Sequence, residues 1–101
     1  MVKVRWTDYA IENLVAIGGY IELDSPFYAK EVVSALFNSV DILEAHPLAG
    51  RIVPEFENKT IRELIRNNYR IVYKLVTESD IDILTVHHSA RLLRDIPSKH
   101  K

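Results

Sequence analysis

Two stretches in the first half of the chain repeat their apolar residues at the spacing of an amphipathic α-helix. The first follows Thr7 and Asp8, residue types that cap helix N-termini, and its apolar positions are 10, 14, 17 and 21. The second follows Ser25, its expected cap, with Pro26 at the first helical position. It is expected to end near Pro47, because a residue before proline avoids helical backbone angles. The short connection predicts an antiparallel helix hairpin.

After Gly50 the pattern changes to the alternation that is typical of β-strands. Turn-forming residues at 67–68 and 78–80 separate the apolar runs, so these strands are expected to form an antiparallel meander. Another alternating run precedes the first helix. The expected strands are residues 2–6, a short extended piece at 51–54, and residues 61–65, 69–76 and 81–88.

This order predicts a single α+β domain over residues 1–101: an N-terminal strand, a two-helix hairpin and a three- to four-stranded antiparallel meander. A short C-terminal helix is expected at residues 89–95, followed by a frayed tail at 96–101. The hairpin is expected to cover one face of the sheet. The opposite face is expected to stay open to solvent.

The composition narrows the function classes. The chain has no cysteine, which excludes disulfides, thiolate nucleophiles and cysteine-bound zinc. No apolar run approaches the roughly 18 residues that span a bilayer, and the N-terminus does not resemble a signal peptide. A soluble cytoplasmic protein with no membrane partner is therefore expected.

The net charge of −1 conceals an asymmetry along the chain. Residues 1–50 hold three cations and seven anions, whereas residues 51–101 hold ten cations and seven anions. We expect an anionic partner to bind the second half. The overall balance is nevertheless far from that of a dedicated nucleic-acid binder, which is strongly basic.

Arg70 is the most informative residue of the second half. It lies in the run 69–76, where alternation directs Tyr69 and Tyr73 to one face and Arg70 and Lys74 to the other. A guanidinium is always charged and is costly to bury without a partner. Arg70 is therefore expected on an open face, where it either pairs with Glu63 of the neighbouring strand or binds an anionic partner.

Several landmarks follow one another at specific spacings along residues 4–94. They are Trp6-Thr7, Ser25-Pro26, Leu43-x-x-x-Pro47-x-x-Gly50-Arg51, Arg62-Glu63-Leu64, Asn68-Tyr69-Arg70-Ile71-Val72-Tyr73, and Ile83-Leu84-Thr85-Val86-His87-His88 followed by Arg91. As an ordered set they resemble the RelE/ParE superfamily of bacterial and archaeal toxins, and most closely its ParE-like branch.

The resemblance implies a toxin of a type II toxin–antitoxin system, with growth inhibition and plasmid stabilisation as its expected roles. RelE-like members cut messenger RNA in the ribosomal A site, whereas ParE-like members poison DNA gyrase. The favoured interpretation is a ParE-like, gyrase-directed toxin. One alternative is a ribosome-dependent mRNA endoribonuclease, and another is a non-toxic member that only binds its antitoxin and autoregulates its operon.

The ribonuclease alternative assigns catalytic roles. A metal-free ribonuclease needs a base, an acid and cations for the developing phosphorane charge. Arg70 occupies the strand position at which RelE-like enzymes carry an arginine for the phosphate, and His88 is the candidate acid or base. No tyrosine follows Tyr73, so the RelE-like set is incomplete and enzymatic activity stays an open question.

The remaining site predictions concern binding. Candidate target- or phosphate-binding residues are Arg51, Arg62, Lys74 and Arg91. No metal or cofactor is expected, since adjacent His87 and His88 point to opposite sheet faces.

The predicted protein partners are a cognate antitoxin and either DNA gyrase or the ribosome with its mRNA. The antitoxin is expected to lay a segment into a groove along the hairpin and the sheet edge. The candidate antitoxin-binding residues are Arg5, Val15, Leu23, Phe27 and Tyr28. The expected assembly is a homodimer or a toxin–antitoxin hetero-oligomer.

Overall fold

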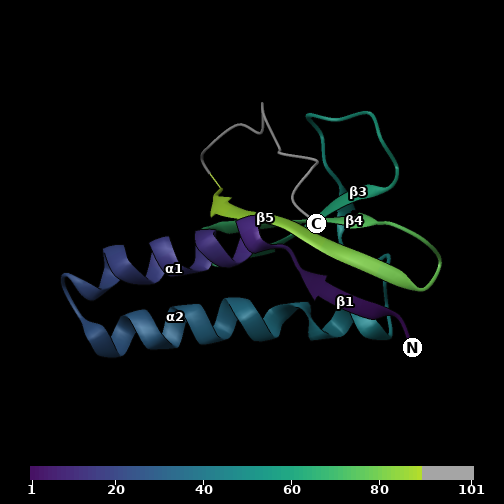
Figure 1. Cartoon of the computed structure of the whole chain (residues 1–101). Helices are drawn as coiled ribbons and strands as arrows, with labels where there is room; N and C mark the ends of the chain where they lie inside the picture. The colour runs from purple at the N-terminus through teal and green to yellow at the C-terminus, as the bar shows by residue number, and fades with distance from the viewer. Residues whose placement is uncertain (90–101) are drawn as a thin grey trace.

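The computed structural model describes residues 1–89, which fold into one five-stranded sheet with a helix hairpin on one of its faces (Figure 1). The order of strands across the sheet is β1-β5-β4-β3-β2. The elements are β1 (Lys3–Trp6), α1 (Asp8–Glu22), α2 (Pro26–Asn38), the 3₁₀-helix η1 (Ser39–Glu44), β2 (Arg51–Ile52), β3 (Ile61–Arg66), β4 (Tyr69–Leu75) and β5 (Asp80–His88). The α+β class is confirmed. The C-terminal helix and tail expected after Ser89 lie outside the described residues.

The helix hairpin begins at the residues that the sequence predicts. The Thr7 hydroxyl accepts a hydrogen bond from the Ala10 N–H at 3.1 Å and donates one to the Ile83 carbonyl at 2.7 Å, which ties the start of α1 to the sheet. The Ser25 hydroxyl accepts from the Tyr28 N–H at 3.1 Å, and Pro26 begins α2. Both caps are confirmed.

The second helix ends earlier than predicted. It stops at Asn38 and continues as the 3₁₀-helix η1, so the expectation of one α-helix reaching Pro47 is wrong. At the junction the Ser39 hydroxyl donates to the Leu36 carbonyl at 2.7 Å. Such a bond from side chain to backbone competes with the regular helical ladder, which accounts for a change of helix type at this point.

The predicted meander is confirmed, because β3, β4 and β5 pair antiparallel in sequence order. The N-terminal strand β1 pairs parallel with β5 and so brings the first residues of the chain beside the last described strand. Where β1 stops at Trp6, α1 takes over this edge of β5. The Asn13 side-chain oxygen accepts from the Val86 N–H at 2.9 Å and from the Thr85 hydroxyl at 2.7 Å.

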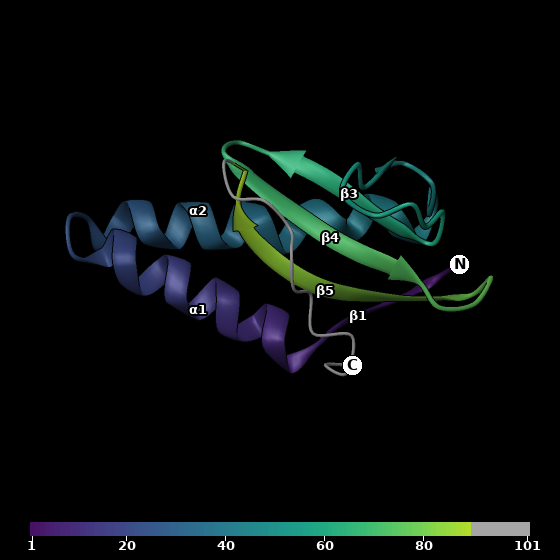
Figure 2. The same cartoon turned by 90° about the horizontal axis from the view of Figure 1, so that it is seen from above.

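The main core lies between the sheet and the hairpin and includes Leu14, Leu36, Ile71, Tyr73 and Ile83. The other face of the sheet, which we call the helix-free face, is not bare. There the segment after β2 crosses the sheet, and its Val53 packs on Val72 of β4 to make a second, smaller core. Figure 2 shows the sheet from above, with α2 passing behind it and α1 alongside β5.

Within residues 1–89, no helix has the length and apolar character needed to cross a membrane.

Candidate functional site

Arg70 lies on the helix-free face, but it is not displayed to solvent as the sequence suggested. Only 5% of its surface is exposed. Its terminal nitrogens donate to the two carboxylate oxygens of Glu55 at 2.7 and 2.8 Å, and its Nε donates to Glu63 at 2.5 Å. The expectation of an open guanidinium is therefore wrong, whereas the alternative, a pair with Glu63, is confirmed.

The strand register explains how Glu63 becomes the centre of this network. Arg51 of β2 stands directly opposite Glu63, and Arg70 of β4 lies on the diagonal, two residues from the partner Val72. One Glu63 oxygen binds Arg70, and the other binds the Arg51 Nε at 2.6 Å. A fully buried carboxylate needs such compensation, because removing a charge from water is costly.

The network of Arg51, Glu55, Glu63 and Arg70 is electrically balanced, with two cations and two anions. Hydrogen bonding to Glu55, and then to Glu63, raises the Arg70 pKa against the opposing effect of burial, so the guanidinium stays charged. Glu55 comes from the segment after β2. Sequence reasoning missed it, since periodicity does not show where a loop crosses a sheet.

The four predicted target-binding residues do not gather into one cationic surface. Arg51 belongs to the balanced network, and Lys74 lies half-exposed on the helix-free face. Arg62 lies on the opposite face, beside Tyr73 in the register, and donates to the Gly50 carbonyl at 3.0 Å. Arg91 lies outside the described residues.

The predicted catalytic pair, Arg70 and His88, does not converge. Arg70 stands opposite His87 in the register, whereas His88 stands opposite Tyr69 on the other face of the sheet. The His88 ring meets the Tyr69 ring edge-on, with centroids 5.8 Å apart. The two side chains therefore cannot act on one phosphate from the same surface.

The Pro47-x-x-Gly50-Arg51 motif has a structural role that sequence reasoning missed. The buried Tyr73 hydroxyl donates to the Pro47 carbonyl at 2.8 Å and accepts from the Gly50 N–H at 2.9 Å. A Cβ at position 50 would lie 2.5 Å from the Glu63 backbone oxygen, so only glycine fits. The motif thus holds the end of the helical half against β3 and β4.

The predicted antitoxin-binding residues divide between two surfaces. Leu23, Phe27 and Tyr28 lie at the tip of the hairpin, where Tyr20 joins them, and these four side chains are 59–83% exposed. Val15 is also exposed, farther along α1. Arg5 belongs to β1 instead and donates to the buried Asp82 on the helix-free face at 3.2 and 3.3 Å. Figure 1 shows the tip at the end of the helices away from β1.

Within the described residues 1–89, no group of three or more histidine, aspartate or glutamate side chains is arranged to hold a metal ion.

Comparisons with known proteins identify the family. Residues 4–93 match the family model described as the ParE toxin of the type II toxin–antitoxin system parDE. The chain is 36% identical over 87 residues to the putative toxin Y4kP of Sinorhizobium fredii, covering 86% of this chain and 88% of that protein. It is 32% identical over 92 residues to the toxin RelE2 of Caulobacter vibrioides, covering 91% of this chain and all of the relative.

Solved structures agree with the sequence matches. A chain of the chromosomal ParDE system from P. aeruginosa superposes with a TM-score of 0.70 at 26% identity, covering 87% of this chain and 96% of that one. A chain of the RelBE2 toxin–antitoxin complex from Mycobacterium tuberculosis superposes with a TM-score of 0.58 at 26% identity, covering 86% and 96%. The chain therefore belongs to the ParE toxins of type II toxin–antitoxin systems, within the RelE/ParE superfamily.

Proposed function

We propose that this toxin inhibits growth by acting on DNA gyrase, without cutting RNA, and that a cognate antitoxin neutralises it. The observation that carries this choice of target is the state of Arg70. Its Nε donates to the Glu63 carboxylate and its two terminal nitrogens donate to the Glu55 carboxylate, at donor–acceptor distances of 2.5–2.8 Å. The phosphate of an RNA transition state would have to compete with these carboxylates for the guanidinium.

The charges around Arg70 support the same choice. Binding ribosomal RNA requires several phosphates to be neutralised at once. In the part of the chain that the structure describes, Arg51 and Arg70 are neutralised by carboxylates, and Arg62 lies on the other face of the sheet. The candidate acid or base, His88, does not share a surface with Arg70, since it lies on the opposite face of the sheet.

The test separates the gyrase target from the mRNA target and from a non-toxic member. The toxin is expressed from an inducible promoter, growth is followed, covalent gyrase–DNA cleavage complexes are trapped and counted, and mRNA 5′ ends are mapped. We expect growth arrest with gyrase-linked DNA breaks and intact mRNA. Cuts in translated mRNA without gyrase complexes would establish the endoribonuclease, and unimpaired growth would establish the non-toxic member.

A control variant is needed because Arg70 is structural. Replacing it would remove one of the two arginines that bind the buried Glu63 carboxylate, so a loss of toxicity in Arg70→Ala would reflect unfolding as readily as lost chemistry. Glu55→Gln is the sharper variant, since it loosens one side of the guanidinium and keeps the Glu63 pair. We expect Glu55→Gln to produce no mRNA cuts with purified ribosomes.

A further inference from the structure

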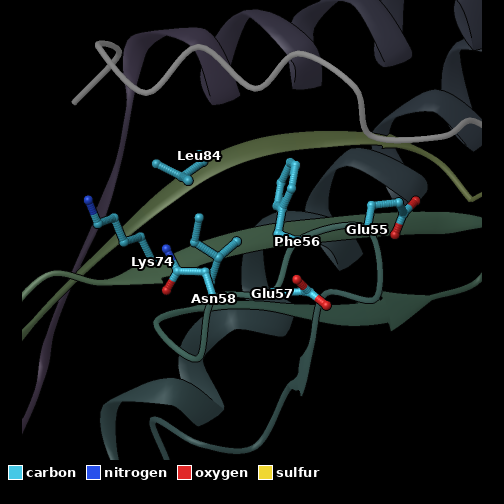
Figure 3. Close-up of a pocket in the computed structure, with 7 residues that line it drawn as sticks. Glu55, Phe56, Glu57, Asn58, Lys74 and Leu84 are labelled. Carbon is cyan, nitrogen blue, oxygen red and sulfur yellow. The ribbon is translucent and has the colours of Figure 1, made fainter.

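A pocket of about 390 Å³ opens on the helix-free face, between the segment 55–58 and strands β4 and β5. Its apolar walls are Phe56, Ile61 and Leu84. Figure 3 labels Phe56 and Leu84. Phe56 and Ile61 also pack on the small second core of Val53 and Val72. An apolar side chain that entered the pocket would therefore extend an existing core and would be removed from contact with water.

Lys74 supplies the pocket with its positive charge. It is half-buried in β4, and no residue within 1–89 forms an ion pair or hydrogen bond with its ammonium group. Asp82 is its cross-strand neighbour, but the Asp82 carboxylate is bound by Arg5 from β1, at 3.2 and 3.3 Å. The row Arg5–Asp82–Lys74 therefore carries two cations and one anion beside the pocket.

The charges at the two ends of the pocket differ. Figure 3 shows the Lys74 ammonium at one end, with the carboxylates of Glu55 and Glu57 directed away from it at the other. Glu55 is committed to Arg70. A ligand that places an apolar group in the pocket is thus attracted to Lys74 when it carries a carboxylate next to that group.

We propose that this pocket docks a segment of a partner protein that inserts one large apolar side chain between Phe56, Ile61 and Leu84 and places a neighbouring aspartate or glutamate against Lys74. The identification of that partner as the cognate antitoxin rests on the proposed function. The docking site itself rests on the pocket, on a Lys74 that has no partner among residues 1–89, and on the ion pair between Asp82 and Arg5.

The test uses random peptides, so it does not require the partner to be known. Twelve-residue peptides displayed on phage are selected on the wild-type protein, on Lys74→Glu and on Lys30→Glu, a matched control that makes the same change at an exposed position of α2. We expect wild-type protein and Lys30→Glu to enrich peptides with a large apolar residue beside an acidic one. A synthetic peptide from this selection should bind Lys74→Glu about tenfold more weakly by fluorescence anisotropy, since it loses a charge-assisted bond.

The binding position is read by two-dimensional amide NMR on the wild-type protein, where the peptide should shift the signals of Phe56, Lys74 and Leu84. Equal affinity for wild type and Lys74→Glu would overturn the proposal, as would shifts confined to the hairpin tip. Growth and gyrase assays play no part in this experiment. If the toxin acts on a target other than gyrase, the result of the peptide experiment is unaffected. If the peptide does not bind the pocket, the assignment of gyrase as the target is unaffected.

Discussion

Glu63 is the residue that holds the charged network of the helix-free face together, because both of its oxygens are bonded to arginines from neighbouring strands. Glu63→Gln removes the anion and deprives the buried Arg70 of one of its two carboxylate partners in the network. Breaking a buried ion pair from one side costs roughly 3 kcal/mol, so we expect a loss of that size in the free energy of unfolding. Urea denaturation followed by circular dichroism measures it. Glu57→Gln, at an exposed position, should change it by less than about 0.5 kcal/mol.

Gly50 is required because of what surrounds it. In Gly50→Ala the new Cβ would meet the Glu63 backbone oxygen at 2.5 Å and the Tyr73 ring at 2.8 Å. A strand backbone cannot move aside cheaply, so we expect a loss of about 1–3 kcal/mol in the free energy of unfolding. Gly19→Ala is the matched control, since nothing lies within 4 Å of the added carbon inside α1. It should stabilise the protein by about 0.5–1 kcal/mol, and equal losses in both variants would contradict this account.

Tyr73 makes stability depend on pH. Burial raises the pKa of its phenol above the ordinary value of 10.0. The folded protein therefore keeps this proton at a pH where the unfolded chain releases it, so the stabilisation is complete below pH 10 and declines as the pH rises further. Urea denaturation between pH 8 and pH 11 should show a smaller decline in Tyr73→Phe than in wild type. Parallel declines would show that other groups cause the dependence.

At the scale of elements, the two helix caps are similar in sequence but differ in how much they contribute to stability. Thr7 is buried and binds both the Ala10 N–H and the Ile83 carbonyl, whereas Ser25 caps its helix at an exposed position. We expect Thr7→Ala to cost about 2 kcal/mol and Ser25→Ala about 0.5–1 kcal/mol in the free energy of unfolding. Thermal and urea denaturation of the two variants measure this difference. A Ser25→Ala loss as large as that of Thr7→Ala would argue against the sheet contact.

The sequence could predict those interactions that join residues close together along the chain. The caps at Thr7 and Ser25 bond residues three positions away, and the meander strands are consecutive, so local patterns were sufficient. The parallel pairing of β1 with β5 joins residues almost eighty positions apart, and no local pattern encodes it.

The same reasoning applies to the candidate site. The sequence predicted Glu63 as one partner of Arg70 because alternation on adjacent strands fixes which residues share a face. Glu55 could not be found in this way, since it reaches Arg70 from an irregular segment. The prediction of an open Arg70 was therefore wrong because of the path of this segment. The strand register, which places Arg70 and His88 on opposite faces, was not evident from the sequence, whereas the sequence landmarks identified the correct family.

At the scale of the whole molecule, the chain offers two separated surfaces. The helix-free face combines a balanced charge network with a pocket and with Lys74, which has no partner in the described part of the chain. The hairpin tip presents Tyr20, Leu23, Phe27 and Tyr28 to solvent, at the end of the molecule away from β1 (Figure 1). Exposed apolar patches of this kind are typical of protein interfaces. We therefore expect a second segment of the antitoxin, distinct from the one that docks in the pocket, to cover the tip, in line with the residues that the sequence singled out there.

The double variant Leu23→Ser with Phe27→Ser tests this expectation. Both side chains are already more than 70% exposed, so their loss should change the free energy of unfolding by less than about 1 kcal/mol. Buried in an interface they would act as anchors, and their removal should weaken antitoxin binding by roughly 2 kcal/mol or more, about thirtyfold. Calorimetric titration with purified cognate antitoxin measures the affinity. Leu48→Ser, which changes an exposed leucine outside the hairpin, is the control and should bind as wild type does. Unchanged affinity in the double variant would place the antitoxin elsewhere on the molecule.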